Sequence, residues 1–326
     1  MPLVSVLVPV HNDAAFLNQA LCSVAAQTFK DFEVVVCDDA SEDGGLSIAR
    51  QWAVKDDRFK VFANDEKLGM TLNWNRALSN ASGRYVVKLD SDDAMQPRCL
   101  ELLTEEMENS LETYVAFCRT LSCDENLEPV SSYLGDNAFV LFGLDPLIRH
   151  LRSGHDFYTR SFSDFQLWSS NAQIHRRENL VEMGGWDATW GCASDTDLIL
   201  RVLERGKTVA HIPYAGILYR NRPRSVSDSF RKNGWLRWEG TLILLLSLGR
   251  YYASGDRLNS RLRREWWRYW RNLAQLRTES DVSSFPEPIR TNLALATRSI
   301  TRPPMKVMLE GRLRQTLWHL KRKVLR

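Results

Sequence analysis

The first 99 residues alternate continuous apolar runs with segments whose apolar residues recur every three or four positions. Continuous apolar runs are typical of strands covered on both faces, and they predict strands at 5–10, 32–37, 59–62 and 84–89. The wider spacing predicts helices at 14–28, 44–54 and 72–78. Strands separated by helices of this length indicate an α/β fold with a mostly parallel sheet flanked by helices.

The pattern is less regular after residue 99. It predicts a helix at 100–107, a tight turn at 184–187 and a helix at 195–204. Residues 231–326 have a helical and polar-aromatic pattern, in which prolines favour several short helices over one long helix. We therefore expect a domain at 1–230, with halves at 1–99 and 100–230, followed by a C-terminal helical region at 231–326.

The composition is that of an ordinary globular protein. Of the 326 residues, 44% are hydrophobic and 25% charged, and the mean hydropathy is −0.33. These proportions exclude a disordered, collagen-like or coiled-coil chain. The best apolar run, Thr241–Leu248, has less than half of the roughly 20 residues that a membrane-spanning helix needs. Because no signal-peptide pattern opens the chain, we expect a cytoplasmic protein whose six scattered cysteines are reduced.

Charge divides the chain into two parts. Residues 231–326 contain 21 Lys/Arg and 7 Asp/Glu, a net charge of +14, whereas residues 1–230 carry −11. Within 261–273, arginines flank a stripe of apolar and aromatic residues: Leu262, Trp266, Tyr269, Trp270 and Leu273. Together with the basic end at 321–323, this stripe favours binding to an anionic membrane surface, on the cytoplasmic face of the inner membrane. The alternative is packing against the acidic part of the chain. Nucleic acid is a poorer candidate, because no binding motif for it accompanies the charge.

Polar residues follow three of the predicted strands directly. The first strand runs into Pro9-Val-His-Asn-Asp13, the second into Asp38-Asp39-Ala-Ser41 and the fourth into Asp90-Ser-Asp-Asp93. The carboxyl ends of parallel strands meet at one edge of a sheet, where such sheets bind ligands. Carboxylates gathered there repel one another, and Mg²⁺ or Mn²⁺ held by Asp90 and Asp92 would relieve the repulsion. Taken alone, the Asp90–Asp93 segment is also compatible with an Asp-rich turn that binds no metal.

These motifs resemble, in order and spacing, the family 2 glycosyltransferases of the GT-A fold. The family has an apolar strand that ends in Pro-x-Tyr-Asn, and Pro9–Asn12 is similar to it. Ser23–Gln27 resembles the family's Ser…Gln segment, and Asp38–Ser41 resembles its Asp-Asp-Gly-Ser. Residues 64–69 resemble the family's Asn-x-x-Asn-x-Gly stretch. Further polar and small residues of the pattern follow at 75–85, and the Asp-x-Asp lies at 90–92. The match is specific over about ninety residues and, with the motifs of the second half, covers roughly 1–225.

The second half adds two motifs to the resemblance. Gly184-Gly-Trp-Asp187 is similar to the family's Gly-Gly-Phe-Asp, and Ser194–Arg201 to its Glu-Asp-x-Asp-Leu-x-x-Arg helix. The second match implies that Asp195 is the general base, which accepts the proton of the acceptor hydroxyl as the new bond forms. A carboxylate that only stabilises the start of its helix is the alternative. Trp186 and Asp187 are expected to bind the acceptor, although a packed Trp186 is an equally good interpretation.

The resemblance also implies a donor site. Asp39 is expected to contact the nucleobase or ribose, Asp90 the ribose or donor sugar, and Asp92 the metal. The full set of expected donor-binding residues is Pro9, His11, Asn12, Asp38, Asp39, Lys67, Asn75, Asp90, Ser91 and Arg222. The chain departs from the family at His11, Ala40, Lys67 and Ser194, and Arg222 stands where many members have a histidine. A guanidinium cannot ligate a metal, but it can pair with phosphate oxygens.

The function expected from this resemblance is that of an inverting, metal-dependent glycosyltransferase. It would move a sugar from a nucleotide sugar, a UDP-sugar above all, to a glycan or lipid-linked acceptor in cell-surface polysaccharide synthesis. Dehydrogenase and P-loop enzymes are excluded, because neither Gly-rich phosphate motif follows the first strand. A sugar-nucleotide pyrophosphorylase would need a Gly-rich, basic loop there. The alternative from another class is a non-catalytic nucleotide-sugar-binding or scaffold protein that retains the fold.

Overall fold

The computed structural model describes most of the first 223 residues and part of the C-terminal region. The described residues are 1–134, 144–161, 171, 173–223, 225–226, 228, 232, 235–253, 262–263, 265–266 and 268–272.

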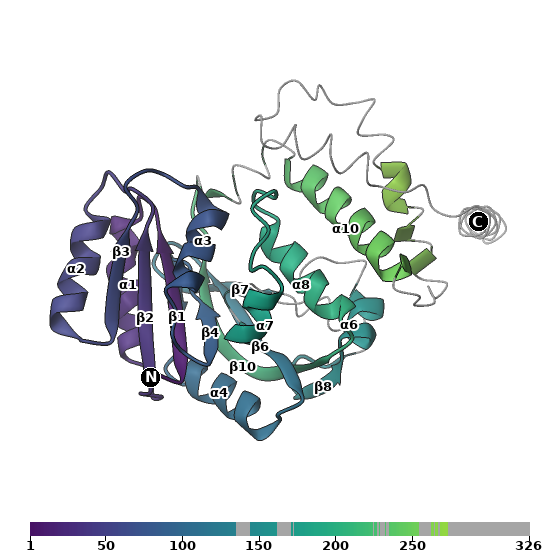
Figure 1. Cartoon of the computed structure of the whole chain (residues 1–326), viewed down its shortest axis with the longest axis horizontal. Helices are drawn as coiled ribbons and strands as arrows, with labels where there is room; N and C mark the ends of the chain where they lie inside the picture. The colour runs from purple at the N-terminus through teal and green to yellow at the C-terminus, as the bar shows by residue number, and fades with distance from the viewer. Residues whose placement is uncertain are drawn as a thin grey trace.

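The first half forms the parallel layer that the sequence predicts (Figure 1). The strands lie in the order β3-β2-β1-β4 and are all parallel: β1 (Val4–Val10), β2 (Phe32–Asp38), β3 (Phe59–Ala63) and β4 (Tyr85–Lys88). The crossovers are α1 (Ala14–Ala25), α2 (Gly45–Lys55) and α3 (Met70–Ser79). Every strand and helix predicted up to residue 99 is confirmed within a few residues.

The second half extends the same sheet with strands that the sequence pattern missed. They are β5 (Ala94–Met95), β6 (Thr113–Cys123), β7 (Pro129–Leu134), β8 (His150–Ser153), β9 (Gln173–Arg176) and β10 (Thr208–Arg220). The sheet runs β3-β2-β1-β4-β9-β6-β10-β5, with β7 on β6 and β8 on β10. Because β9 is antiparallel to both β4 and β6, the sheet as a whole is mixed rather than mostly parallel.

Irregular pairing explains why the longest strand was hard to predict. The register of β10 against β6 shifts at Ile212/Ala215 and again at Ala215/Ile217, around Pro213 and Gly216. Each shift changes which side chains point to a given face, so no alternation of apolar and polar residues survives along the strand.

Helices cover both faces of the sheet and create two apolar cores. One core joins the sheet to α1, α2 and α4 (Cys99–Asn109). The other joins it to α3, α7 (Arg177–Glu182) and α8 (Ser194–Glu204), and reaches α6 (Gly154–Ser161) and α10 (Trp235–Ala253). The helices predicted at 100–107 and 195–204 are confirmed as α4 and α8.

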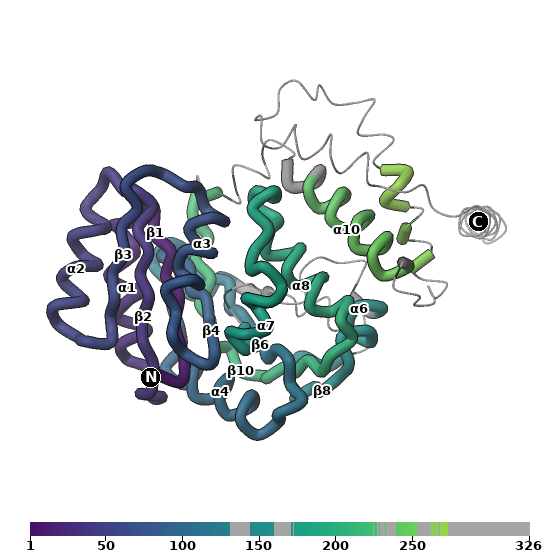
Figure 2. Tube along the Cα trace, in the orientation of Figure 1, coloured from purple at the N-terminus to yellow at the C-terminus, as the bar shows by residue number. Residues whose placement is uncertain are grey.

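The described part of the C-terminal region packs on the sheet domain. Figure 2 shows α10 beside α8, and the two helices are linked by an ion pair between Arg250 Nε and Glu204 Oε2 at 2.8 Å. Ser247 on α10 also lies 2.9 Å from the Tyr158 hydroxyl of α6. Residues 231–326 therefore do not all form a separate body.

The predicted membrane-binding stripe is covered by protein. Leu262, Trp266 and Tyr269 are at most 4% exposed and belong to the same core as α8 and α10. The ring of Trp266 meets that of Tyr252 on α10 edge to face, with centroids 5.7 Å apart. Leu262, Trp266 and Tyr269 therefore pack inside the protein as the alternative predicts, whereas Trp270 is only partly buried. Binding of the basic C-terminal region to an anionic membrane surface stays a prediction. Leu273 and residues 321–323 lie outside the described residues.

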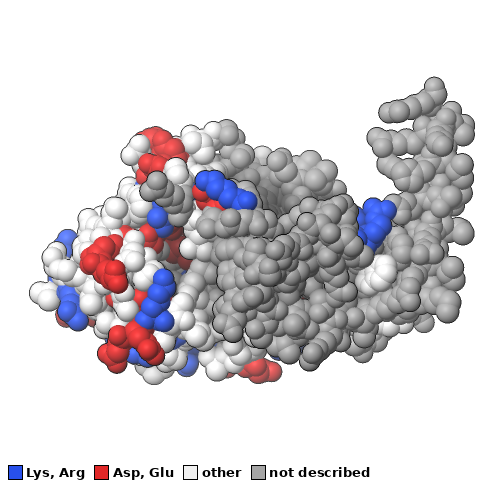
Figure 3. Space-filling model, turned by 90° about the horizontal axis from the view of Figure 1, so that it is seen from above, with Lys and Arg blue, Asp and Glu red and all other residues white. Residues whose placement is uncertain are grey.

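Two further observations bear on surfaces and membranes. Acidic and basic side chains are interspersed on the described part of the face in Figure 3, so the −11 charge of residues 1–230 does not gather there in one acidic patch. Among the helices that the structure describes, none has the length and apolarity to cross a bilayer.

Candidate functional site

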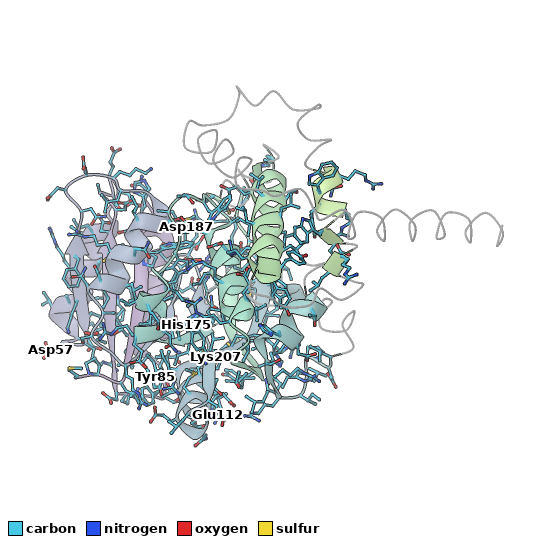
Figure 4. The ribbon with its side chains drawn as sticks, turned by 45° about the vertical axis from the view of Figure 1, so that its right-hand side comes forward. Asp57, Tyr85, Glu112, His175, Asp187 and Lys207 are labelled. Carbon is cyan, nitrogen blue, oxygen red and sulfur yellow. The ribbon has the colours of Figure 1, made fainter. Side chains whose placement is uncertain are left out.

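The site lies where β1, β2 and β4 end. Tyr85, the first residue of β4, lies below Asp187, from the turn before α8, in the view of Figure 4. Lys88 and Asp90 at the end of β4 act on the pKa of Asp195, so the carboxyl end of β4 and the start of α8 face the same region, where sheets of this kind bind ligands.

The turns after β1 and β2 hold each other. His11 Nδ1 lies 2.8 Å from the carbonyl oxygen of Asp39, and the backbone N–H of Asn12 donates to Ser41 Oγ at 3.0 Å. Asn12 and Ala40 have φ values of 55° and 51°, in the region that favours glycine. The family's Gly at the position of Ala40 thus has a backbone reason. Pro9, inside β1, is buried.

Asp39 is buried and holds the loop before α3. Its Oδ1 accepts hydrogen bonds from Asn64 Nδ2 at 2.8 Å and from the N–H of Leu68 at 2.7 Å, and its Oδ2 accepts from Gly69 N at 2.8 Å. Both oxygens are therefore bound within the chain. Lys67, adjacent to the fixed Leu68, is exposed. The neighbouring Asp38 accepts from Ser41 N through Oδ2, while its buried Oδ1 has no partner among the described residues.

An arginine bridges the Asp-x-Asp loop and the β1 turn. Arg222 donates from Nε to Asp92 Oδ2 and from Nη2 to Asp13 Oδ1, both at 2.6 Å. Ser91 Oγ donates to the other oxygen of Asp13 at 2.6 Å, and the guanidinium of Arg222 lies 5.0 Å from the ring centroid of Phe16. Arg222 thus provides the positive charge that Asp92 and Asp13 need.

Asp92 and Asp90 have the chemistry of Mg²⁺ or Mn²⁺ ligands, but both are paired with cations of the chain. Burial and the charge of Asp90 raise the pKa of Asp92, and Arg222 opposes the rise. That repulsion is what a divalent ion would relieve. No group of three His, Cys, Asp or Glu side chains within the described residues is arranged to hold a metal. A metal at Asp92 Oδ2 would therefore compete with Arg222 for that oxygen.

Lys88 is a buried cation at the centre of the site. It is 2% exposed, and its ammonium group donates to Asp90 Oδ1 and, at 2.8 Å, to Asn171 Oδ1. It also lies 4.2 Å from the ring centroid of Trp74 on α3. The Asp90 carboxylate and the Asn171 amide oxygen satisfy the ammonium group of this buried lysine, which lies at the carboxyl end of β4.

Asp195 lies in the first turn of α8, half-buried. Its Oδ1 accepts from the N–H of Thr196 at 2.6 Å, and Thr71 on α3 meets the adjacent Ser194 hydroxyl at 3.0 Å. Burial raises the pKa of Asp195, Lys88 lowers it and Asp90 raises it further. A carboxylate of raised pKa is a better proton acceptor than an ordinary one. The charges of Lys88 and Asp90, at the end of β4, therefore affect the pKa of Asp195.

Asn75 and Trp186 have structural roles here, and of the two interpretations of Trp186 the packed one fits the structure. Trp186 is 2% exposed and meets Trp74 edge to face at 5.8 Å, so its ring cannot offer a platform to an acceptor. Asn75 Nδ2 donates to Trp186 O at 2.7 Å, and Asn75 Oδ1 accepts from Trp186 N at 3.0 Å. The amide of Asn75 is thus occupied by the Gly-Gly-Trp-Asp turn and is not free for a donor. Asp187 caps its own turn, accepting from Thr189 N at 2.9 Å.

Sequence reasoning assigned no role to three charged residues of this site. Asp13 lies among the polar residues at the predicted strand ends, but no ligand or partner was predicted for it. Lys88 is a charged residue inside the apolar run of β4, and a charge in a run of buried positions is itself a signal of a paired or functional group. Glu239 of α10 accepts hydrogen bonds from the loop before α8, and nothing in the local sequence indicates such a long-range contact.

Solved structures show the class of fold. TarS from S. aureus in complex with UDP-GlcNAc is similar with a TM-score of 0.65 and 18% identity, over 94% of this chain and 83% of that one. A mannosyltransferase from Pyrobaculum calidifontis, in complex with GDP-Man and Mn²⁺, has a TM-score of 0.50 and 18% identity over 98% and 88%. At this identity the likeness defines the fold alone: the chain has the fold of the GT-A transferases.

Sequence comparisons show the family. The family models named Glycosyl transferase family 2 and Glycosyl transferase family group 2 match residues 5–164 and 85–287. The chain belongs to the family 2 glycosyltransferases. A putative glycosyltransferase, EpsE, from Bacillus subtilis is 39% identical over 31% of this chain, and a β-1,3-glucosyltransferase from Campylobacter jejuni is 39% identical over 32%. The matched segments cover 36% and 35% of those proteins, so the chain spans about a third of their length.

Proposed function

We propose that the protein is an inverting glycosyltransferase that uses Asp195 as its general base. The observation that supports this most is an electrostatic one: Lys88 and Asp90, from the end of β4, act on Asp195 at the start of α8. A non-catalytic protein that only retained the fold would have no need of a half-buried carboxylate with a raised pKa opposite the Asp-x-Asp loop.

The chemistry follows from these residues. Asp195 accepts the proton of the acceptor hydroxyl while the hydroxyl oxygen attacks the anomeric carbon of the donor. The bond from that carbon to the diphosphate breaks on the opposite face, which inverts the configuration. Arg222 and Lys88 then face the negative charge that develops on the leaving diphosphate, an electrostatic contribution of several kcal/mol in comparable sites. If Mg²⁺ or Mn²⁺ binds, Asp90 and Asp92 hold it and it neutralises the same charge.

The donor and acceptor are proposed more broadly. UDP-GlcNAc and GDP-Man are bound by proteins of this fold, and a UDP-sugar remains our first candidate for this chain. Relatives named for teichuronic acid biosynthesis and for glucosyl transfer to an undecaprenol-linked glycan support a glycan or lipid-linked acceptor in surface polysaccharide synthesis. In this proposal His11, Asn12 and Lys67 contribute to the nucleotide site, and Asp187 borders the acceptor.

A donor panel tests the proposal. Purified full chain is incubated with UDP-, GDP- and dTDP-sugars, with and without Mn²⁺, and release of the nucleoside diphosphate is followed together with thermal shift. We expect one nucleotide class to stabilise the protein and to be turned over slowly to the free sugar. Stabilisation without any turnover, with or without candidate glycan acceptors, would favour the binding-protein alternative instead.

A further inference from the structure

A carboxylate from α10 binds the loop from which α8 starts. Glu239 is 3% exposed. Its Oε1 accepts from the N–H of Gly191 at 2.7 Å and its Oε2 from the N–H of Ala193 at 3.1 Å, and the N–H of Cys192 between them donates to the same carboxylate. Three successive backbone N–H groups form a concave anion site, and here the anion is a side chain of the same chain.

Glu239 fixes the loop that leads into α8, a helix whose N-terminus has no side-chain cap of its own. The residue before the helix is Ala193, whose methyl group accepts no hydrogen bond, and the Ser194 hydroxyl is directed to Gly191 O and Thr71. Negative charge is favourable near the start of a helix. The carboxylate that accepts from the three amides just before α8 comes from a helix more than forty residues later in the chain.

Glu239 also contributes to the electrostatics of Asp195. Burial raises the pKa of Glu239, and the charge of Asp195 is among the further causes. Lys88 and Asp90 from the end of β4 act on Asp195, and because repulsion between two carboxylates is mutual, we infer that an ionised Glu239 acts on it from α10 as well. Glu239 differs from the other two because it also fixes the backbone immediately before Asp195.

We propose that Glu239 is a positioning residue for Asp195, and that α10 thereby belongs to the catalytic unit. The inference depends on the proposed role of Asp195 as the base. Glu239 itself touches neither donor nor acceptor in this scheme. It fixes the 191–193 loop so that the Asp195 carboxylate points into the site, and its charge makes Asp195 more basic.

The test compares Glu239→Gln with Glu204→Gln. The first change retains the side-chain volume and one accepting oxygen, but it removes the charge and leaves one N–H group without an acceptor. Glu204 offers the matched change, because it also links α8 to α10, through Arg250, but at the other end of α8. Hydrogen exchange of the amides of residues 190–196 is measured first, since it needs no substrate.

We expect faster exchange at 191–193 in Glu239→Gln and wild-type exchange there in Glu204→Gln. With the sugar nucleotide that is turned over in the donor panel, kcat should fall roughly ten-fold in Glu239→Gln while KM for the donor changes little. The acidic limb of the kcat–pH profile should move to lower pH by about half a unit to one unit, because a negative neighbour of the base is removed. Glu239→Asp retains the charge, so its acidic limb should lie at the same pH as that of the wild type.

Unchanged exchange at 191–193, or an unmoved acidic limb in Glu239→Gln, overturns the inference. So does an equal change of the limb in Glu204→Gln, because that would show a general effect of loosening α10. Failure of the proposed function is a separate result: there the wild-type chain turns over no sugar nucleotide, or Asp195→Asn turns it over as fast as wild type.

Discussion

Two carboxylates of the same site, Asp92 and Asp195, have opposite surroundings. Asp92 is paired with the guanidinium of Arg222 at 2.6 Å. Among the residues that the structure describes, Asp195 makes no ion pair, and its hydrogen bonds come from the adjacent Thr196. Burial raises the pKa of both, but only at Asp92 does a bound cation of the chain oppose the rise directly.

The difference separates two tasks within one site. A carboxylate that already holds a guanidinium is a poor proton acceptor, because its negative charge is compensated. It is suited to arranging positive charge for a diphosphate. A carboxylate without such a partner keeps its basicity and can take a proton from a hydroxyl. The chain thus divides donor and acceptor chemistry between the end of β4 and the start of α8.

Removing the charge of Asp195 or of Asp92 should have the largest effects, and the two effects should differ. Asp195→Asn should lower kcat by about 10³-fold or more while the dissociation constant for UDP stays at the wild-type value, because only the proton acceptor is lost. Asp92→Ala should weaken UDP binding, because the loop then loses its anchor to Arg222. Calorimetric UDP binding and steady-state kinetics provide both numbers. Equal loss of UDP binding in the two variants would contradict the division of tasks.

Glu33, a carboxylate outside the site, has a lowered pKa, in contrast to Asp92 and Asp195. Burial alone would raise the pKa of Glu33 on β2, but hydrogen bonds from Lys60, Ser5 and Ser82 outweigh it and lower the pKa from 4.5 to about 2. A lowered folded-state pKa stabilises the protein above pH 4.5, and this stabilisation is lost as the pH falls toward 2.

Over that window the wild-type chain should therefore lose roughly 2 kcal/mol more unfolding free energy than Glu33→Gln does. Urea unfolding at a series of pH values measures this, with the exposed Glu112→Gln as the control. Parallel curves for wild type and Glu33→Gln would show that these hydrogen bonds do not set the acid stability.

The smallest expected effect concerns Arg222, whose guanidinium is paired with Asp92. Arg222→Ala frees the carboxylates of Asp13 and Asp92, so Mn²⁺ should bind the nucleotide-free protein about ten-fold more tightly, whereas UDP without metal should bind about ten-fold more weakly. Mn²⁺ binding is followed by electron paramagnetic resonance and UDP binding by calorimetry. Arg58→Ala, which removes an arginine paired with Asp56 away from the site, should change neither. An unchanged Mn²⁺ affinity in Arg222→Ala would show that the arginine does not compete with metal.

The sequence was informative where local spacing determines structure. The strands β1, β2 and β4 are buried on both faces and read as mostly apolar runs, and the polar residues that follow them meet at one edge for topological reasons. The bulged strand β10 and the short strand β9 gave no such signal, because their side-chain alternation is broken or too brief.

Long-range contacts explain the remaining differences. Whether Asn75 faces a ligand or the turn at Trp186 depends on how two segments 111 residues apart pack. The pairing of Arg222 with Asp13 spans 209 residues, and the burial of Trp266 depends on α10. Composition correctly marked 231–326 as different in charge, but charge does not say which of its side chains face inward.

The docking of α10 has a practical consequence for exchanging parts between related enzymes. A chimera joined at residue 230, where the composition changes, would combine the sheet of one protein with a foreign C-terminal helix. It could fold and still bind nucleotide, yet the loop that leads into α8 would lack the acceptor for three backbone amides. A junction after residue 253 transfers α8 together with the helix that supports it, and is the better place to cut.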